Sequence, residues 1–189
     1  MPENSTERRV KKMNSIINNS SKALLVIDVQ KDYFSEKRKP MFSYNTKECL
    51  SSINAAIKEY SRNGYRIIYI GQVFPDLITN RWFIGFSIKG TEGAELADGL
   101  DVVSDLYFEK NLPDTFTSKQ FREFVSENKI EEFDICGIDL CGCVGATALG
   151  AAKSGYRAGI VRNSTFSRFP DVKQSRMMVK LANAGVKFI

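Results

Sequence analysis

The chain has 189 residues, 43% of them hydrophobic, which suits a single domain with one core. It contains no histidine, so mechanisms and metal sites that need an imidazole are excluded. The net charge of +5 comes largely from a polar N-terminal stretch and one loop, and we expect no nucleic-acid partner. The four cysteines lack zinc-ligand or disulfide spacing, and no run of about 18 apolar residues exists, so we expect no metal, no cofactor and no membrane span.

The first residues of the chain are polar and basic and lack the apolar region of a secretory signal. We interpret residues 1–20 as a flexible N-terminal arm and residues 21–189 as one domain. A cytoplasmic location is the corresponding expectation.

The first half of this domain shows a strand, a helix and a second strand. Ala23–Ile27 is a short apolar run, typical of a strand buried on both faces of a sheet. Asn45 and Glu48 resemble a capping box, and apolar residues follow at helical spacing until Gly64 ends the helix. Arg66–Ile70 then predicts the second strand.

The second half alternates in the same way after a long irregular stretch, Gly71 to Gly99, of the kind that often forms a lid. Strands alternating with helices predict a mainly parallel sheet covered on both faces. The remaining predicted elements are strands at Val102–Phe108, Phe133–Ile138, Arg157–Val161 and Val186–Ile189, and helices at Thr117–Asn128, Cys143–Lys153 and Val172–Asn183.

Three reactive side chains follow the carboxyl ends of predicted strands, where parallel sheets bind ligands. Asp28 ends the first strand, Lys110 comes just after the third, and Cys143 opens the helix that follows the fourth. A helix N-terminus and a nearby ammonium would favour a thiolate, and Asp28 could accept the thiol proton. Taken singly, each residue has an ordinary alternative role: Asp28 in a cap or ion pair, Lys110 in solvent, Cys143 in packing.

Four segments resemble the isochorismatase-like cysteine hydrolase superfamily, and the similarity runs from about residue 22 to the C-terminus. The resemblance implies a three-layer α/β/α sandwich with a mainly parallel six-stranded sheet, and a homodimer or homotetramer. The four segments are ALLVIDVQKDY (23–33), GTEGAEL (90–96), FEKNLPDTF (108–116) and GIDLCGCVGATALGAAKSGY (137–156).

The resemblance also assigns roles to particular residues. The family's catalytic Asp, Lys and Cys fall on Asp28, Lys110 and Cys143. A cis peptide is expected between Ile138 and Asp139, and the N–H groups of Asp139 and Cys143 would then form an oxyanion hole. Asp139, Leu140 and Cys141 replace the small hydroxyl residues common before the nucleophile, which leaves the substrate open.

Three branches of the superfamily can be weighed. The nicotinamidase branch holds a metal through an Asp and histidines after the second strand, but GQVFPDLITNRW (71–82) has no histidine there. The isochorismatase branch hydrolyses a vinyl ether with the Asp as acid and often without the Cys. A metal-free branch cleaves small amides, ureido or N-carbamoyl compounds with the full triad, and it fits this sequence best. A catalytically inactive binding relative is the alternative outside enzymes.

A small-molecule substrate needs a pocket at this rim. We expect aromatic residues of the long loop to form much of its wall, with a subunit interface as the alternative role for Trp82. The predicted pocket residues are Tyr33, Gln72, Phe74, Trp82, Tyr107, Leu140 and Gly142.

Overall fold

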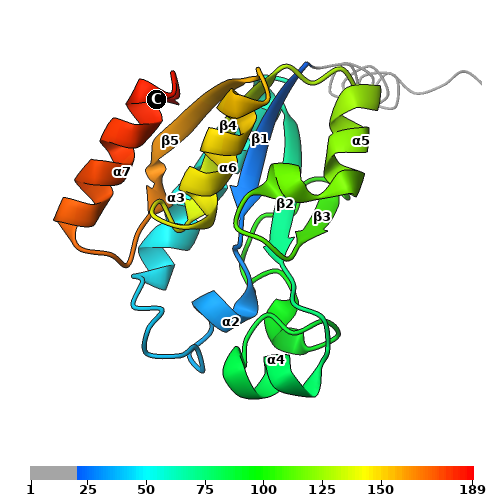
Figure 1. Ribbon diagram of the computed structural model, residues 1–189, viewed down its shortest axis with the longest axis vertical. Helices are drawn as coiled ribbons and strands as arrows, with labels where there is room; N and C mark the ends of the chain where they lie inside the picture. Colours follow the sequence, from blue (N-terminus) through cyan, green and yellow to red (C-terminus); the bar gives the residue numbers. More distant parts are fainter. Residues whose placement is uncertain (1–20) are drawn as a thin grey trace, which may run out of the picture.

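A computed structural model describes residues 21–189; the predicted arm, residues 1–20, lies outside this range. The described part contains one six-stranded sheet in the order β3-β2-β1-β4-β5-β6, with every neighbouring pair parallel (Figure 1). The sheet predicted from the sequence is therefore confirmed. Its strands are β1 (Lys22–Ile27), β2 (Arg66–Gln72), β3 (Tyr107–Lys110), β4 (Glu132–Ile138), β5 (Arg157–Phe166) and β6 (Lys187–Phe188).

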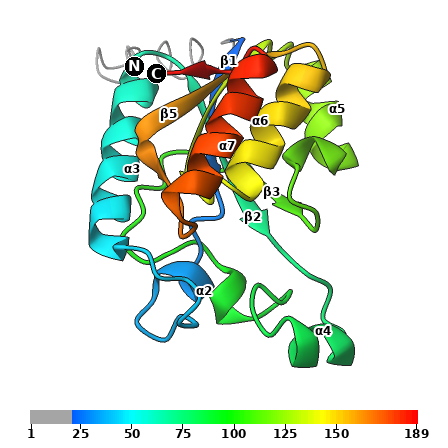
Figure 2. The same ribbon diagram turned by 60° about the vertical axis from the view of Figure 1, so that its left-hand side comes forward.

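Helices cover both faces of this sheet, so the domain has three layers (Figures 1 and 2). Helix α3 packs on one face, whereas α5, α6 and α7 pack on the other. Within residues 21–189 no helix is long and apolar enough to span a bilayer. The helices are α2 (Lys31–Phe34), α3 (Thr46–Arg62), α4 (Ile78–Phe83), α5 (Lys119–Glu127), α6 (Cys143–Lys153) and α7 (Asp171–Asn183), with 3-10 turns η1 (Glu92–Ala94) and η2 (Thr115–Thr117).

Strand β1 shows why the sequence folds into layers. Its side chains alternate between two cores: Leu25 and Ile27 face α5, α6 and α7, whereas Leu24 and Val26 face α3. All four are at most 1% exposed. A continuous apolar run is what a strand buried on both faces requires.

Three element predictions need correction. The strand predicted at Arg157–Val161 continues to Phe166, where it still pairs with β4. The third strand begins at Tyr107, not at Val102, because the buried hydroxyl of Tyr69 engages the Asp101 carbonyl and the Val103 N–H and holds this segment outside the ladder. The helix predicted at Thr117–Asn128 begins later, because Asp114 caps the separate turn η2. The Asn45 cap was correctly predicted: its side chain accepts from the Glu48 N–H.

The order of the strands positions the reactive residues. The chain moves outward from β1 to β2 and β3 on one side, and from β4 to β5 and β6 on the other, so β1 and β4 form the switch point where ligands bind in such sheets. Asp28 follows β1, and the turn containing Cys143 follows β4. The expected cis peptide lies between Ile138 and Asp139.

Gly137, near the end of β4, allows the close approach of β1 that this switch point needs. It has φ +110°, and a Cβ atom there would lie 2.2 Å from the Ile27 carbonyl oxygen. Gly155, with φ +85°, has no atom within 4 Å of the same position. An alanine at Gly155 would therefore meet only the cost of the positive φ, whereas an alanine at Gly137 would also meet the steric clash with Ile27.

We predict that Gly137→Ala lowers the free energy of unfolding by more than about 3 kcal/mol, because neither backbone can move without breaking the ladder. Gly155→Ala should cost only about 1 kcal/mol. Urea denaturation of both variants measures the difference. Equal losses in the two variants would show that β1 and β4 are not in obligatory close contact at Gly137.

Candidate active site

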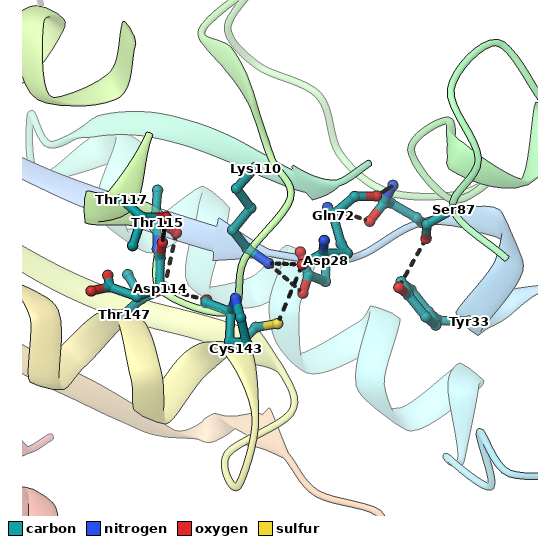
Figure 3. A network of polar contacts seen from close by, with 12 residues as sticks. Asp28, Tyr33, Gln72, Ser87, Lys110, Asp114, Thr115, Thr117, Cys143 and Thr147 are labelled. Carbon is teal, nitrogen blue, oxygen red and sulfur yellow. Dashed lines mark hydrogen bonds and ion pairs between the residues drawn. The ribbon is translucent and has the colours of Figure 1, made fainter. Parts of the chain in front are cut away.

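A buried ion pair lies at the carboxyl end of the sheet (Figure 3). The Lys110 Nζ lies 3.1 Å from Asp28 Oδ2 and donates to Gln72 Oε1 at 2.8 Å. The Lys110 side chain is 0% exposed and that of Asp28 5%. Gln72 and Lys110 are register partners in β2 and β3, which places their side chains on the same side of the sheet. Three neighbouring strands thus supply a carboxylate, an amide and an ammonium.

The local backbone and charge fix these groups. Asp28 has φ +54°, which non-glycine residues seldom adopt, and its N–H donates to the Ile70 carbonyl, so the carboxylate turns away from the strand. Burial opposes the charge on Lys110, but the Asp28 carboxylate and Cys143 together raise the pKa of the ammonium. Lys110 is therefore a permanent cation at neutral pH.

Two polar atoms of this cluster have no hydrogen-bond partner in the described chain. They are Asp28 Oδ1 and Gln72 Nε2, both buried. Lys110 can only donate, so it fixes the Gln72 oxygen toward itself and the amide nitrogen away from it. Both residues line the same cavity. One acceptor and one donor of residues that line the cavity thus have no partner among the described residues.

The thiol of Cys143, the first residue of α6, completes the cluster. Its Sγ lies 3.9 Å from Gln72 Oε1 and within reach of the Asp28 carboxylate. Burial raises the pKa of the Cys143 thiol, the negative charge of Asp28 raises it further, and Lys110 only partly offsets them. Lys110 lowers the thiol pKa, as expected from the sequence, but its effect is smaller than the combined effect of burial and Asp28. At neutral pH the group is a thiol, which must lose its proton before it can attack.

The turn between β4 and α6 presents backbone donors beside this thiol. Leu140 donates its N–H to the Phe166 carbonyl, and Gly142 and Val144 donate to the Asp139 carbonyl. The N–H groups of Asp139 and Cys143 take no part in this pattern. They are the two donors that the sequence resemblance assigned to an oxyanion hole.

A cavity of about 290 Å³ opens over these groups. Of the predicted pocket residues, Tyr33, Gln72, Phe74 and Gly142 line it, together with Asp28, Asp139 and Cys143. The Tyr33 hydroxyl accepts from the buried Ser87 at 2.8 Å, which holds one wall in place.

Three predicted pocket residues lie elsewhere. Trp82 lies on α4 and is 83% exposed. Hydrogen bonds between Phe74 and residues 87 and 89 close the base of the loop that carries α4, so this helix lies outside the cavity. Tyr107 points to the opposite side of β3 from Lys110 and lines a separate cavity. Leu140 packs its side chain into the core below α6. Subunit contacts of Trp82 stay a prediction.

Sequence analysis missed part of the cavity wall. Arg168 is the important omission: its guanidinium stacks on Phe42 and Phe169, and none of the described carboxylates forms an ion pair with it. The only signal was an arginine between two phenylalanines just after β5. The remaining unpredicted lining residues are Phe42, Tyr44, Phe86, Asn111, Pro113, Ile138 and Phe169, whereas Cys141, expected at the pocket from its place before the nucleophile, does line it.

The donor groups of the described residues bear on metal binding. In residues 21–189 no group of three or more histidine, cysteine or carboxylate residues is arranged to hold an ion, and the full sequence has no histidine. The donors at the cavity are instead one carboxylate, one thiol, amides and cations.

The family model described as isochorismatase domain matches residues 22–189. Two curated relatives also match. An uncharacterized isochorismatase family protein of Bacillus subtilis, YddQ, is 23% identical over 75% of this chain and 76% of its own. A probable inactive nicotinamidase of Arabidopsis thaliana is 24% identical over 87% of this chain and 90% of its own.

Solved structures share the fold. A pyrazinamidase of Pyrococcus horikoshii in complex with zinc superimposes with a TM-score of 0.77 at 21% identity, covering 90% of this chain and 99% of its own. An N-carbamoylsarcosine amidase of Thermoplasma acidophilum gives 0.73 at 21% identity, covering 88% and 94%. At such identities these likenesses establish the fold alone.

The raised pKa of Cys143 predicts how its alkylation depends on pH. At a pH below its raised pKa the thiol stays protonated. In a Cys141→Ser background, the rate at which iodoacetamide alkylates Cys143 should therefore still increase when the pH passes 9.0, the ordinary pKa of a thiol. Asp28→Asn removes the charge that raises this pKa and should shift the profile to lower pH. Mass spectrometry of the Cys143 peptide gives the rates. A wild-type plateau below pH 7 would contradict a resting thiol.

Proposed function

The chain belongs to the isochorismatase family of hydrolases, and within it we propose a metal-free cysteine hydrolase that cleaves a C–N bond in a small amide, ureido or N-carbamoyl compound. The observation that carries the proposal is that Asp28 and the Cys143 thiol line one cavity, with Lys110 buried against the Asp28 carboxylate. A thiol nucleophile, a carboxylate and a fixed cation are the groups needed for covalent acyl transfer.

Asp28 is suited to act as the base. One of its oxygens holds Lys110, and the other has no partner among the described residues, so it is free to accept a proton. In the proposed first half-reaction, Asp28 takes the Cys143 thiol proton and the sulfur attacks the carbonyl carbon. The N–H groups of Asp139 and Cys143 bind the oxyanion, each worth about 2.7–4 kcal/mol where such donors have been removed.

The same carboxylate serves the rest of the cycle. Asp28 passes its proton to the leaving nitrogen, the C–N bond breaks, and an acyl thioester remains on Cys143. Asp28 then takes a proton from water, whose oxygen attacks the thioester, and returns it to the departing sulfur. Lys110 keeps its charge throughout and offsets the negative charge that develops.

The cavity supports a substrate class. Its volume of about 290 Å³ admits only a small molecule. The free Gln72 Nε2 can donate to a carbonyl or ureido oxygen, and Arg168 can pair with an acidic group. Aromatic walls favour contact with the apolar part of the molecule. A small N-acyl or N-carbamoyl compound bearing an acidic group satisfies these features together.

We predict ammonia release from a panel of small amides, ureides and N-carbamoyl acids. Cys143→Ala should reduce turnover by at least about 10³-fold, since the nucleophile is lost, but should retain substrate binding. Asp28→Asn should be equally inactive although its thiol ionises more easily, because the base is missing. Turnover of Asp28→Asn at rates near wild type would exclude Asp28 as the base.

Activity should survive exhaustive chelation, because the full chain has no histidine and the described part has no metal-ligand cluster. Rates before and after dialysis against EDTA provide the measurement. Loss of activity that zinc or iron restores would overturn the metal-free proposal.

A further inference from the structure

The Asp139 carboxylate, which the proposed mechanism leaves unused, accepts four hydrogen bonds. Oδ1 accepts from the Cys141 N–H and from the Ser167 hydroxyl, both at 2.7 Å. Oδ2 accepts from the Tyr44 hydroxyl at 2.9 Å and from the Arg168 N–H at 2.8 Å. The residue is 9% exposed, so these contacts replace most of the water around its carboxylate.

These bonds join three segments that are distant in sequence. Tyr44 precedes α3, Cys141 lies in the turn that carries the nucleophile, and Ser167 and Arg168 follow β5. All three segments contribute to the cavity wall, through Tyr44, Cys141 and Arg168. The Asp139 carboxylate therefore connects two walls of the cavity. The proposed reaction takes place at one wall, and the proposed recognition of an acidic group at the other.

On the side of the nucleophile, Asp139 holds the backbone N–H groups of residues next to Cys143. Its side chain holds the Cys141 N–H, and its carbonyl holds those of Gly142 and Val144 at 2.9 and 3.1 Å. Asp139 thus engages the N–H groups of Cys141, Gly142 and Val144, whereas that of Cys143 takes part in none of these bonds. On the opposite side, the bond to the Arg168 N–H holds the backbone from which the guanidinium extends.

We propose that Asp139 is a positioning residue whose carboxylate sets, at the same time, the oxyanion donors beside Cys143 and the acid-binding guanidinium of Arg168. This inference rests on the proposed function for the role of Cys143 and deepens it by coupling catalysis to recognition of an acidic substrate. A carboxylate is required because each of its oxygens receives two donors. The amide of asparagine would offer a donor to one of these pairs.

The test uses probes that do not depend on knowing the substrate. Iodoacetate carries a negative charge and iodoacetamide does not. The ratio of their alkylation rates at Cys143, divided by the same ratio for glutathione, therefore reports the position of the Arg168 guanidinium. Acylation of Cys143 by p-nitrophenyl acetate, followed as a burst of p-nitrophenolate with Cys143→Ala as blank, reports the oxyanion donors. The variants are Asp139→Asn, Arg168→Gln and, as control, Asp134→Asn.

Asp134 is a matched control because it is a buried carboxylate on β4, the strand that Asp139 follows. It is 6% exposed and lies next to Tyr60 and Tyr65, yet outside this cavity. Asp139→Asn should lower both the iodoacetate preference and the burst rate about tenfold, the size of a lost charge-assisted hydrogen bond. Arg168→Gln should lower the preference alone. Asp134→Asn should change neither, even if its melting temperature falls as far.

The proposal is overturned if Asp139→Asn leaves both readouts at wild-type values, or changes them no more than Asp134→Asn does. It is also overturned if wild type shows no iodoacetate preference that Arg168→Gln removes. Absence of a burst in wild type would instead count against covalent acyl transfer, and the iodoacetate ratio would still decide the role of Asp139 on the Arg168 side.

Discussion

Lys110 and Asp28 hold opposite charges in a space from which water is excluded, and the rest of the site depends on this pair. Removing one member of a buried pair strands the other charge, at a typical cost of about 3–5 kcal/mol. Lys110 orients Gln72 and occupies one oxygen of Asp28, which leaves the other oxygen without a partner among the described residues. Burial raises the thiol pKa of Cys143, Asp28 raises it further and Lys110 lowers it. The parallel sheet brings these side chains together from three strands.

Much of the fold could be predicted because apolar runs and caps are local signals. The strand at Ala23–Ile27 and the Asn45 cap depend only on neighbouring residues. The start of β3 could not be predicted, because it depends on the hydroxyl of Tyr69, which is remote in sequence. The cavity wall was harder still. Trp82 is a residue type common in pockets, but hydrogen bonds at the base of its loop leave it at the surface. Arg168 lines the cavity from a segment in which the sequence shows no motif.

Family membership narrows the chemistry without settling the substrate. The structural neighbours include a zinc-containing pyrazinamidase and an N-carbamoylsarcosine amidase, and one curated relative is described as probably inactive. The local arrangement supports the proposed chemistry: a carboxylate and a thiol line one cavity, and the buried ammonium of Lys110 pairs with that carboxylate.

The central claim is that Cys143 becomes covalently acylated during turnover. Acid quenching of wild-type protein in the steady state, followed by mass spectrometry of the intact chain and of the Cys143 peptide, tests it most directly. The account predicts an added acyl mass on Cys143 that is absent from Cys143→Ala. Near-normal turnover of Cys143→Ala, with Asp28→Asn inactive and no adduct on the wild type, would contradict it and would favour hydrolysis of a vinyl ether with Asp28 as a simple acid.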